Sequence, residues 1–225
     1  MRKIEPGHDR NFDDLAHRFQ EKVYGGLKGR IRLAVLEKDF QEFVPKALMP
    51  DHPMNILDAG GGTGAFSLGL ARQGHCITLC DLSRKMLDKA MENFSQQGLG
   101  HLFLPVHGPI QDLGNQGKGP FDLVLCHAVL EWVKDPRGLI KSLMALTDSR
   151  GILSLVFYNL NGMVFKNLLR TNYKKILEKD YPGYEVHKKA HDDLTRQVLE
   201  LQTKFTAGSA TISFEVLEFL SAWLK

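Results

Sequence analysis

The sequence predicts an α/β domain in which a parallel β-sheet is covered by helices on both faces. Between residues 54 and 159, short apolar runs alternate with longer runs of helical periodicity. Continuous apolar strands that are separated by helices are typical of parallel sheets buried on both sides. A glycine-rich segment directly after the first apolar run is typical of nucleotide-binding domains of this class. A chain of 225 residues with 43% hydrophobic and 24% charged residues fits one such domain.

Five strands and three helices can be placed from these patterns. The strand candidates are residues 55–57, 76–80, 102–106, 123–126 and 152–158. The helix candidates lie at about 65–73, 84–97 and 136–147. Ser83 can cap the second helix through its hydroxyl, and Asp135 followed by Pro136 is a favourable start for the third.

The segments on either side of this core differ from it in pattern. Residues 1–50 form an N-terminal helical extension with a helical pattern from about residue 9, in which Asp13 opens an amphipathic run. Residues 51–160 form the α/β core, and residues 161–225 form a C-terminal segment whose end fits a strand or a helix. The stretches 1–50 and 160–225 each carry ten Lys and Arg against eight Asp and Glu. This mild positive charge is compatible with a polyanionic partner without identifying one.

The strongest chemical signal is the run from Asp58 to Gly64, which reads D-A-G-G-G-T-G between a strand and a helix. Glycines allow a tight turn and bring backbone N–H groups close to a ligand, because no Cβ is in the way. The pattern G-x-G-x-x-A is that of dinucleotide sites, and D-x-G-x-G-x-G is the first motif of the class I methyltransferases, which bind S-adenosylmethionine. The glycines alone leave both cofactors open. The candidate cofactor residues of this run are Asp58, Gly60, Gly61 and Gly62.

Polar residues after the next three strands complete a candidate site at one edge of the sheet. Asp81 ends the second strand, where a carboxylate can accept hydrogen bonds from both ribose hydroxyls of either cofactor. His127 ends the fourth strand, which places it over the sheet edge beside the cofactor. After the third strand comes a loop in the position where methyltransferases usually contact the adenine, with Ile110, Gln111 and Asp112.

The chain resembles the bacterial tRNA 5-carboxymethoxyuridine carboxyl methyltransferase family over about residues 9–160. The matching segments are 9–14, 24–25, 28–32, 57–62, 79–83, 127–133, 135–137, 153–155 and 157–159. The runs D-R-N-F-D-D at 9–14 and H-A-V-L-E-W-V at 127–133 are much more particular than the glycine motif. The resemblance implies a Rossmann-like class I sheet with an N-terminal helical lid. It also implies that S-adenosylmethionine donates a methyl group to the carboxylate of 5-carboxymethoxyuridine at the tRNA wobble position, which forms a methyl ester.

Site residues follow from the resemblance by matching positions. An arginine suits the carboxylate end of the cofactor, because its planar group meets two oxygens at once. No catalytic acid or base is predicted, because a carboxylate nucleophile is already ionised at neutral pH. Beyond residue 162 the chain departs from the family, so the C-terminal segment is divergent. The cofactor contacts implied by the resemblance are Arg32, Gly60, Gly61, Asp81, the Ile110-Gln111 loop and His127.

Other function classes find little support in the sequence. No apolar run reaches the ~20 residues of a membrane span, and the first residues lack the apolar stretch of a signal peptide. The three cysteines form no C-x-x-C pair, which indicates reduced thiols in a cytoplasmic protein, and no metal site is expected. We therefore expect a cytoplasmic tRNA-modifying methyltransferase with tRNA as its partner. Two alternatives stay open: a methyltransferase for a small or carrier-bound carboxylic acid, and a cofactor-binding protein without activity.

Overall fold

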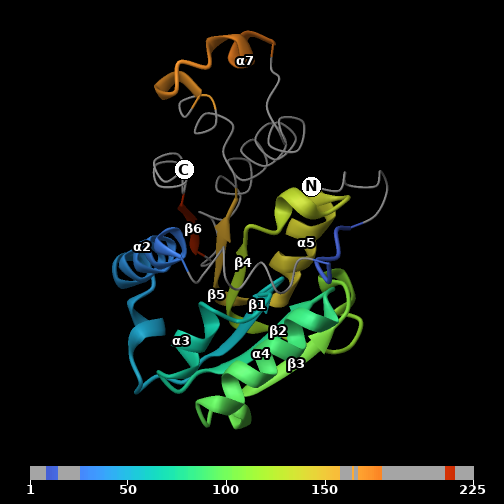
Figure 1. The fold of residues 1–225 in the computed structure, drawn as a ribbon. Helices are drawn as coiled ribbons and strands as arrows, with labels where there is room; N and C mark the ends of the chain where they lie inside the picture. The colour runs from blue at the N-terminus through green and yellow to red at the C-terminus, as the bar shows by residue number, and fades with distance from the viewer. Residues whose placement is uncertain (1–8, 15–25, 158–163, 165–166, 179–210, 216–225) are drawn as a thin grey trace.

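One six-stranded sheet organises the computed structural model, which describes residues 9–14, 26–157, 164, 167–178 and 211–215. The strand order is β3-β2-β1-β4-β5-β6, and every neighbouring pair is parallel (Figure 1). The carboxyl ends of these strands therefore meet at one edge, where ligands of open parallel sheets bind. The strands are β1 (Asn55–Ala59), β2 (Cys76–Asp81), β3 (Phe103–His107), β4 (Phe121–His127), β5 (Thr147–Val156) and β6 (Thr211–Glu215).

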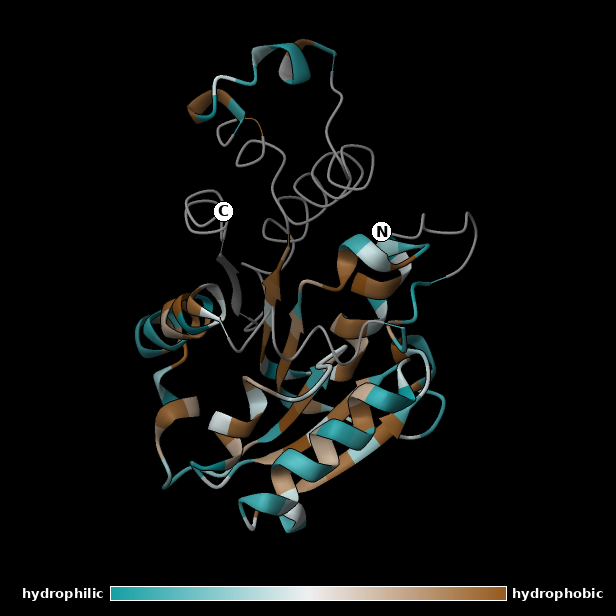
Figure 2. Ribbon diagram, in the orientation of Figure 1, coloured by the Kyte–Doolittle hydropathy of each residue, from teal (hydrophilic) through white to brown (hydrophobic). Residues whose placement is uncertain are grey.

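Helices cover both faces of the sheet, because successive side chains of each buried strand point to opposite sides. In β4, Leu123 and Leu125 pack into one core cluster, and Val124 and Cys126 pack into the other. The hydrophobic sheet lies between these layers, while the outer surface of α4 is hydrophilic (Figure 2). The first layer contains α2 (Leu27–Phe43), α3 (Ser67–Ala71) and α4 (Arg84–Gln96), and the second contains η4 (Ile110–Asp112) and α5 (Pro136–Leu146).

The fold predicted from the sequence is confirmed, with shifted element ends. The largest shift is in β5, which begins at Thr147 instead of Ile152. Thr147 pairs with Phe121 of β4, and the register shifts before Leu123 pairs with Ile152. The Asp148 carboxylate accepts the N–H of Arg150 at 2.9 Å within this irregular part. Polar residues of this kind give no strand signal in the sequence, which explains the late start that was predicted.

The N-terminal extension is only partly helical. Helix α2 packs Phe40 and the following Val44 into the core cluster on one face of the sheet, and it also buries Leu36. Residues 9–14 are not helical, which corrects the helical pattern expected from about residue 9. The Asn11 side chain accepts the N–H of Asp13 at 2.8 Å, a local hydrogen bond of the kind that competes with helix formation. The amphipathic run expected after Asp13 lies outside the described residues up to residue 25.

The C-terminal segment contributes an edge strand. Backbone pairing with β5 makes residues 211–215 a parallel strand, which resolves the choice between strand and helix for that part. Short helix α7 (Tyr173–Glu178) lies beyond the carboxyl edge of the sheet (Figure 1). No helix among the described residues is long and apolar enough to cross a membrane.

Candidate functional site at the carboxyl edge of the sheet

The loop between β1 and α3 depends on its glycines. Gly60, Gly62 and Gly64 have φ values of +74°, +58° and +69°, in the left-handed region that side chains disfavour. A Cβ at Gly60 would lie 2.5 Å from a methyl carbon of Val129, in the loop after β4. A Cβ at Gly64 would lie 2.9 Å from the ring of Phe94 in α4. The loop therefore exposes backbone without side chains at its glycines, and it packs closely against Val129 and Phe94.

Asp58 supports this loop from inside the protein. Its side chain is 6% exposed, and a Cβ at Gly61 would overlap its carboxylate. Burial raises the pKa of Asp58 to about 6. The nearby charge of Asp81 adds to this rise, and a hydrogen bond with the Ser67 side chain opposes it. The carboxylate thus lies directly against the backbone of the glycine loop. A direct contact between Asp58 and a cofactor stays a prediction.

Asp81 is fixed at the end of β2 by two backbone donors. The N–H of Gly62 donates to Oδ2 at 2.9 Å, and the N–H of Ser83 donates to Oδ1 at 2.7 Å. Burial raises the pKa of Asp81, and these two hydrogen bonds oppose that rise. Each carboxylate oxygen can accept more than one hydrogen bond, so acceptor positions are left for the hydroxyls of a ribose.

The loop after β3 places its three candidate residues differently. Ile110 is buried in the core, Gln111 is half-buried and Asp112 is exposed. Within the expected loop they form the 3-10 turn η4. The N–H of Gly108 donates to the carbonyl of Asp81 at 3.1 Å, which joins this loop to the end of β2. A contact of this turn with an adenine stays a prediction.

His127 ends β4 in a closed environment. Its Nε2 lies 2.9 Å from the Ser154 hydroxyl on β5, and its ring lies 5.6 Å from the ring of Phe66. Burial lowers the pKa of His127 to about 4, so the imidazole is neutral at neutral pH. The next residue, Ala128, has a φ of +57°, which is uncommon for a residue with a side chain. Such strain often marks a functional turn.

Three titratable side chains share one face at this edge. Asp81 and His127 are the last residues of β2 and β4, and Asp58 is the second-last residue of β1, which lies between these two strands in the sheet. In a strand, side chains two residues apart lie on the same face of the sheet. The residues two positions before these three are Leu79, Ile56 and Leu125, which all belong to the core cluster under α2, α3 and α4. The structure thus brings together the strand-end residues that the sequence predicted.

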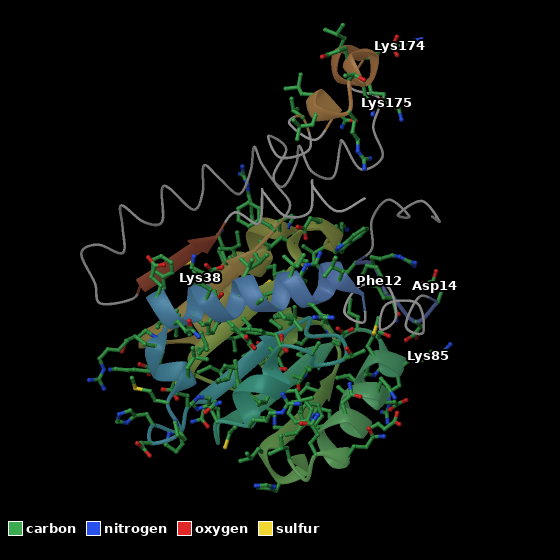
Figure 3. The ribbon with its side chains drawn as sticks, turned by 60° about the vertical axis from the view of Figure 1, so that its left-hand side comes forward. Phe12, Asp14, Lys38, Lys85, Lys174 and Lys175 are labelled. Carbon is green, nitrogen blue, oxygen red and sulfur yellow. The ribbon has the colours of Figure 1, made fainter. Side chains whose placement is uncertain are left out.

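The N-terminal segment 9–14 lies against two of these strand ends. The N–H of Arg10 donates to the carbonyl of Trp132 at 2.9 Å, and the Asp9 carboxylate accepts the N–H of Lys134 at 2.6 Å. The rings of Phe12 and Trp132 meet edge to face, with centroids 5.2 Å apart. Phe12, like Asp14 beside it, lies near the start of α4 (Figure 3).

Arg32 occupies a half-buried position on α2. That helix reaches the candidate site through aromatic rings. The ring of Phe40 lies 4.9 Å from that of Phe66, which in turn contacts His127. A contact between Arg32 and the cofactor stays a prediction.

Sequence reasoning missed three residues that shape the site. Ser154 holds His127, Val129 covers Gly60, and Asp13 bonds Ser83. Ser154 left a weak signal, as a polar residue inside an apolar strand. Asp13 and Val129 lie in the runs 9–14 and 127–133 that carry the family resemblance, but no local pattern predicts their contacts, because each contact joins segments that are distant in sequence.

Comparison with known proteins agrees with this geometry. A family model described as a methyltransferase domain matches residues 57–155. The tRNA 5-carboxymethoxyuridine methyltransferase of Escherichia coli K12 is 38% identical over 185 residues, which cover 77% of this chain and 70% of that protein. The chain belongs to the family of this enzyme. It is therefore an S-adenosylmethionine-dependent methyltransferase, and the choice between the two cofactor classes falls to S-adenosylmethionine.

More distant similarities extend over the methyltransferase fold. The ubiquinone biosynthesis O-methyltransferase of Caulobacter vibrioides is 33% identical over 113 residues, which cover 50% of this chain and 44% of that protein. A crystal structure of a proposed S-adenosyl-L-methionine-dependent methyltransferase from Methanococcus maripaludis superposes with a TM-score of 0.58. It is 18% identical and covers 91% of this chain and 88% of that one, which supports the fold. The part of this methyltransferase that the structure describes contains no group of three His, Cys, Asp or Glu side chains suited to a metal.

Proposed function

We propose that this methyltransferase forms a methyl ester on the carboxylate of 5-carboxymethoxyuridine at the tRNA wobble position. One observation carries the proposal: the two sequence runs most particular to the family, 9–14 and 127–133, pack against each other. They meet through the backbone bond from Arg10 to Trp132 and through the Phe12 and Trp132 rings. The runs are more than a hundred residues apart in sequence, so their contact supports a shared role beside the site.

The chemistry of this reaction suits the groups that the site contains. The cofactor supplies an electrophilic methyl group, and transfer is an in-line displacement that depends mainly on positioning. A carboxylate nucleophile is ionised at neutral pH and needs no general base. His127 is neutral there because burial lowers its pKa to about 4, so it can orient a substrate by hydrogen bonding without removing a proton.

The proposed cofactor contacts follow the geometry of the edge. The backbone of Gly60 to Gly62 would face the amino-acid and ribose parts, and Asp81 would accept the ribose hydroxyls. We expect Asp81→Ala to weaken S-adenosylhomocysteine binding by about 1.5–3 kcal/mol, the usual contribution of a hydrogen bond to a charged group. Isothermal calorimetry measures this, and an unchanged affinity would remove Asp81 from the site.

A tRNA would be held chiefly through its phosphates, so its binding should weaken steeply with salt. Lys174 and Lys175 are exposed on α7, beyond the carboxyl edge of the sheet (Figure 3). Arg170 is exposed just before that helix. The other proposed contacts are Arg30, which is exposed on α2, and the side chains of Lys28 and Lys166, which lie outside the described part of the chain.

The decisive experiment offers the purified protein S-adenosylmethionine and tRNA that carries 5-carboxymethoxyuridine. Mass spectrometry of the digested tRNA should detect a methyl ester on the wobble nucleoside that mild base removes. A variant in which alanine replaces Lys166, Arg170, Lys174 and Lys175 should form less of this ester, and its cofactor affinity should be unchanged. Methylation of a free carboxylic acid in place of the tRNA would favour the small-molecule alternative. Cofactor binding with no acceptor methylated would favour a cofactor-binding protein.

A further inference from the structure

The loop that carries Asp81 is held by three other parts of the chain. The carbonyl oxygen of Leu82 accepts a hydrogen bond from Nδ2 of Asn11 at 3.0 Å, and Nε2 of His107 lies 3.1 Å from the same oxygen. The N–H of Gly62 reaches the Asp81 carboxylate from the glycine loop. The strand end is therefore shaped by tertiary contacts in addition to its own sequence.

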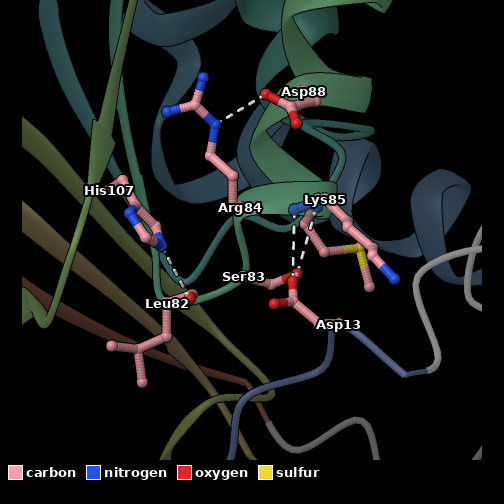
Figure 4. A network of polar contacts seen from close by, with 8 residues as sticks. Asp13, Leu82, Ser83, Arg84, Lys85, Asp88 and His107 are labelled. Atoms are coloured by element: carbon pink, nitrogen blue, oxygen red, sulfur yellow. Dashed lines mark hydrogen bonds and ion pairs between the residues drawn. The ribbon is translucent and has the colours of Figure 1, made fainter.

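Asp13 makes the most concentrated of these contacts (Figure 4). Its Oδ1 accepts the Ser83 hydroxyl at 2.6 Å and the Lys85 N–H at 3.3 Å. Ser83 is fully buried, and its hydroxyl oxygen in turn accepts the N–H of Met86 at 3.2 Å, which caps α4. The hydrogen bond from Ser83 holds the pKa of Asp13 below its usual value, so Asp13 is ionised at neutral pH.

A continuous path joins Asp13 to the proposed ribose acceptor. Asp13 accepts the hydroxyl of Ser83, and the backbone N–H of the same Ser83 donates to Asp81 at 2.7 Å. The negative charge of Asp13 itself raises the pKa of Asp81, so the charge opposes ionisation of the ribose acceptor. What Asp13 contributes to Asp81 is therefore geometry.

We propose that Asp13 is a positioning residue for cofactor binding, which fixes Ser83 and thereby the orientation of the Asp81 carboxylate toward the ribose. The inference rests on the proposed role of Asp81. It extends the site to a segment about seventy residues earlier in the chain. Segment 9–14 then links the ribose-binding loop to the loop after β4, because Asp9 and Arg10 bond the latter.

The test is a double-mutant cycle on cofactor affinity. Calorimetry with S-adenosylhomocysteine compares wild type, Asp13→Ala, Asp81→Ala and the double variant. Asp13→Ala should weaken S-adenosylhomocysteine binding about 5- to 20-fold in the wild-type background. This loss is smaller than that expected from removing the charged hydrogen bonds of Asp81 itself, because Asp13 acts only through Asp81. It should weaken binding less than about twofold when Asp81 is already alanine, since residues in one network are not additive. A general loss of stability would reduce affinity equally in both backgrounds.

Matched variants complete the design. Asp88→Ala removes an equal charge from α4, the helix that Ser83 caps, and should leave affinity unchanged; Asp88 pairs with Arg84 at the surface at 2.9 Å. Asp13→Asn keeps an acceptor oxygen without the charge and should lose less affinity than Asp13→Ala. If the alanine variant does not fold, Asp13→Asn replaces it in the double-mutant cycle.

Three results would overturn the role of Asp13: a wild-type affinity in Asp13→Ala, an equal loss in Asp88→Ala, or an undiminished loss in the Asp81→Ala background. The binding assay needs no methyl acceptor. Normal cofactor binding without an ester on tRNA would therefore refute the tRNA substrate alone, and wild-type protein that fails to bind S-adenosylhomocysteine would refute the cofactor site.

Discussion

Two neighbouring loops at the carboxyl edge place an aspartate in different ways. In the β1–α3 loop, the Asp58 carboxylate is buried beneath glycines, and burial raises its pKa to about 6. In the β2–α4 loop, Asp81 is also shielded, but backbone N–H groups of Gly62 and Ser83 bond both of its oxygens. The first loop is shaped by close packing, and the second is shaped by hydrogen bonds.

The difference predicts how each loop tolerates change. In the closely packed loop, any added atom should be destabilising. In the hydrogen-bonded loop, a substitution should remove only the hydrogen bonds of the replaced side chain. The two loops also meet, because the Gly62 N–H belongs to one and its acceptor Asp81 belongs to the other. Asn93 of α4 adds a second link, since its Nδ2 donates to the carbonyl of Thr63 at 3.0 Å.

The largest effect is expected for Gly60→Ala. The residue has a positive φ, and a Cβ there would lie 2.5 Å from Val129. Strain and overpacking together should lower the free energy of unfolding by about 2–5 kcal/mol. Urea denaturation of the cofactor-free protein measures this loss.

Two further glycines separate the causes. Gly62→Ala meets no atom within 4 Å but keeps a positive φ of +58°, so only about 1–2 kcal/mol should be lost. Gly69→Ala in α3 has neither problem and should gain about 0.5–1 kcal/mol. Equal losses at all three positions would contradict the role assigned to packing.

Asp58→Asn should stabilise the cofactor-free protein near neutral pH. The folded pKa of about 6 exceeds the ordinary value of 3.8, so the folded state binds more protons than the unfolded state between these values. Stability from this group is therefore present below pH 4 and is lost as the pH rises through 6. Removing the ionisation should gain about 2–3 kcal/mol above pH 7 and little at pH 4. Parallel urea titrations of both proteins from pH 4 to 8 would show a constant difference if burial of the charge were unimportant.

Ser83→Ala tests the hydrogen-bonded loop. The substitution removes the cap of α4 and the bond to Asp13 but leaves the backbone N–H that holds Asp81. Thermal unfolding should show a loss of about 1–2 kcal/mol, as for other N-cap residues. A loss as large as that of Gly60→Ala would remove the contrast between the two loops.

Phe12→Leu should cause the smallest loss of stability. Its ring meets Trp132 edge to face at 5.2 Å, and leucine keeps apolar volume without the aromatic pairing. A loss of about 0.5–1.5 kcal/mol is expected from urea denaturation. A neutral result would show that hydrogen bonds, and not the contact between the rings, hold segment 9–14 in place.

The sequence predicted the strand-end residues but missed what holds them. The positions of Asp58, Asp81 and His127 follow from alternating hydrophobic patterns and from the edge at which parallel strands end. The Asp13 contact with Ser83 spans about seventy residues, and no local pattern encodes such a distance. The bond between His127 and Ser154 likewise depends on the register of β4 against β5.

The placement of the cysteines has a practical consequence for labelling. Burial raises the pKa of Cys80 to about 12 and also raises that of Cys126, so neither supplies the thiolate that reacts with alkylating reagents. Cys76 is exposed at the amino end of β2, at the opposite edge of the sheet from Asp81. A maleimide dye should therefore attach to the unaltered sequence at a single position, at the edge of the sheet opposite the proposed cofactor site.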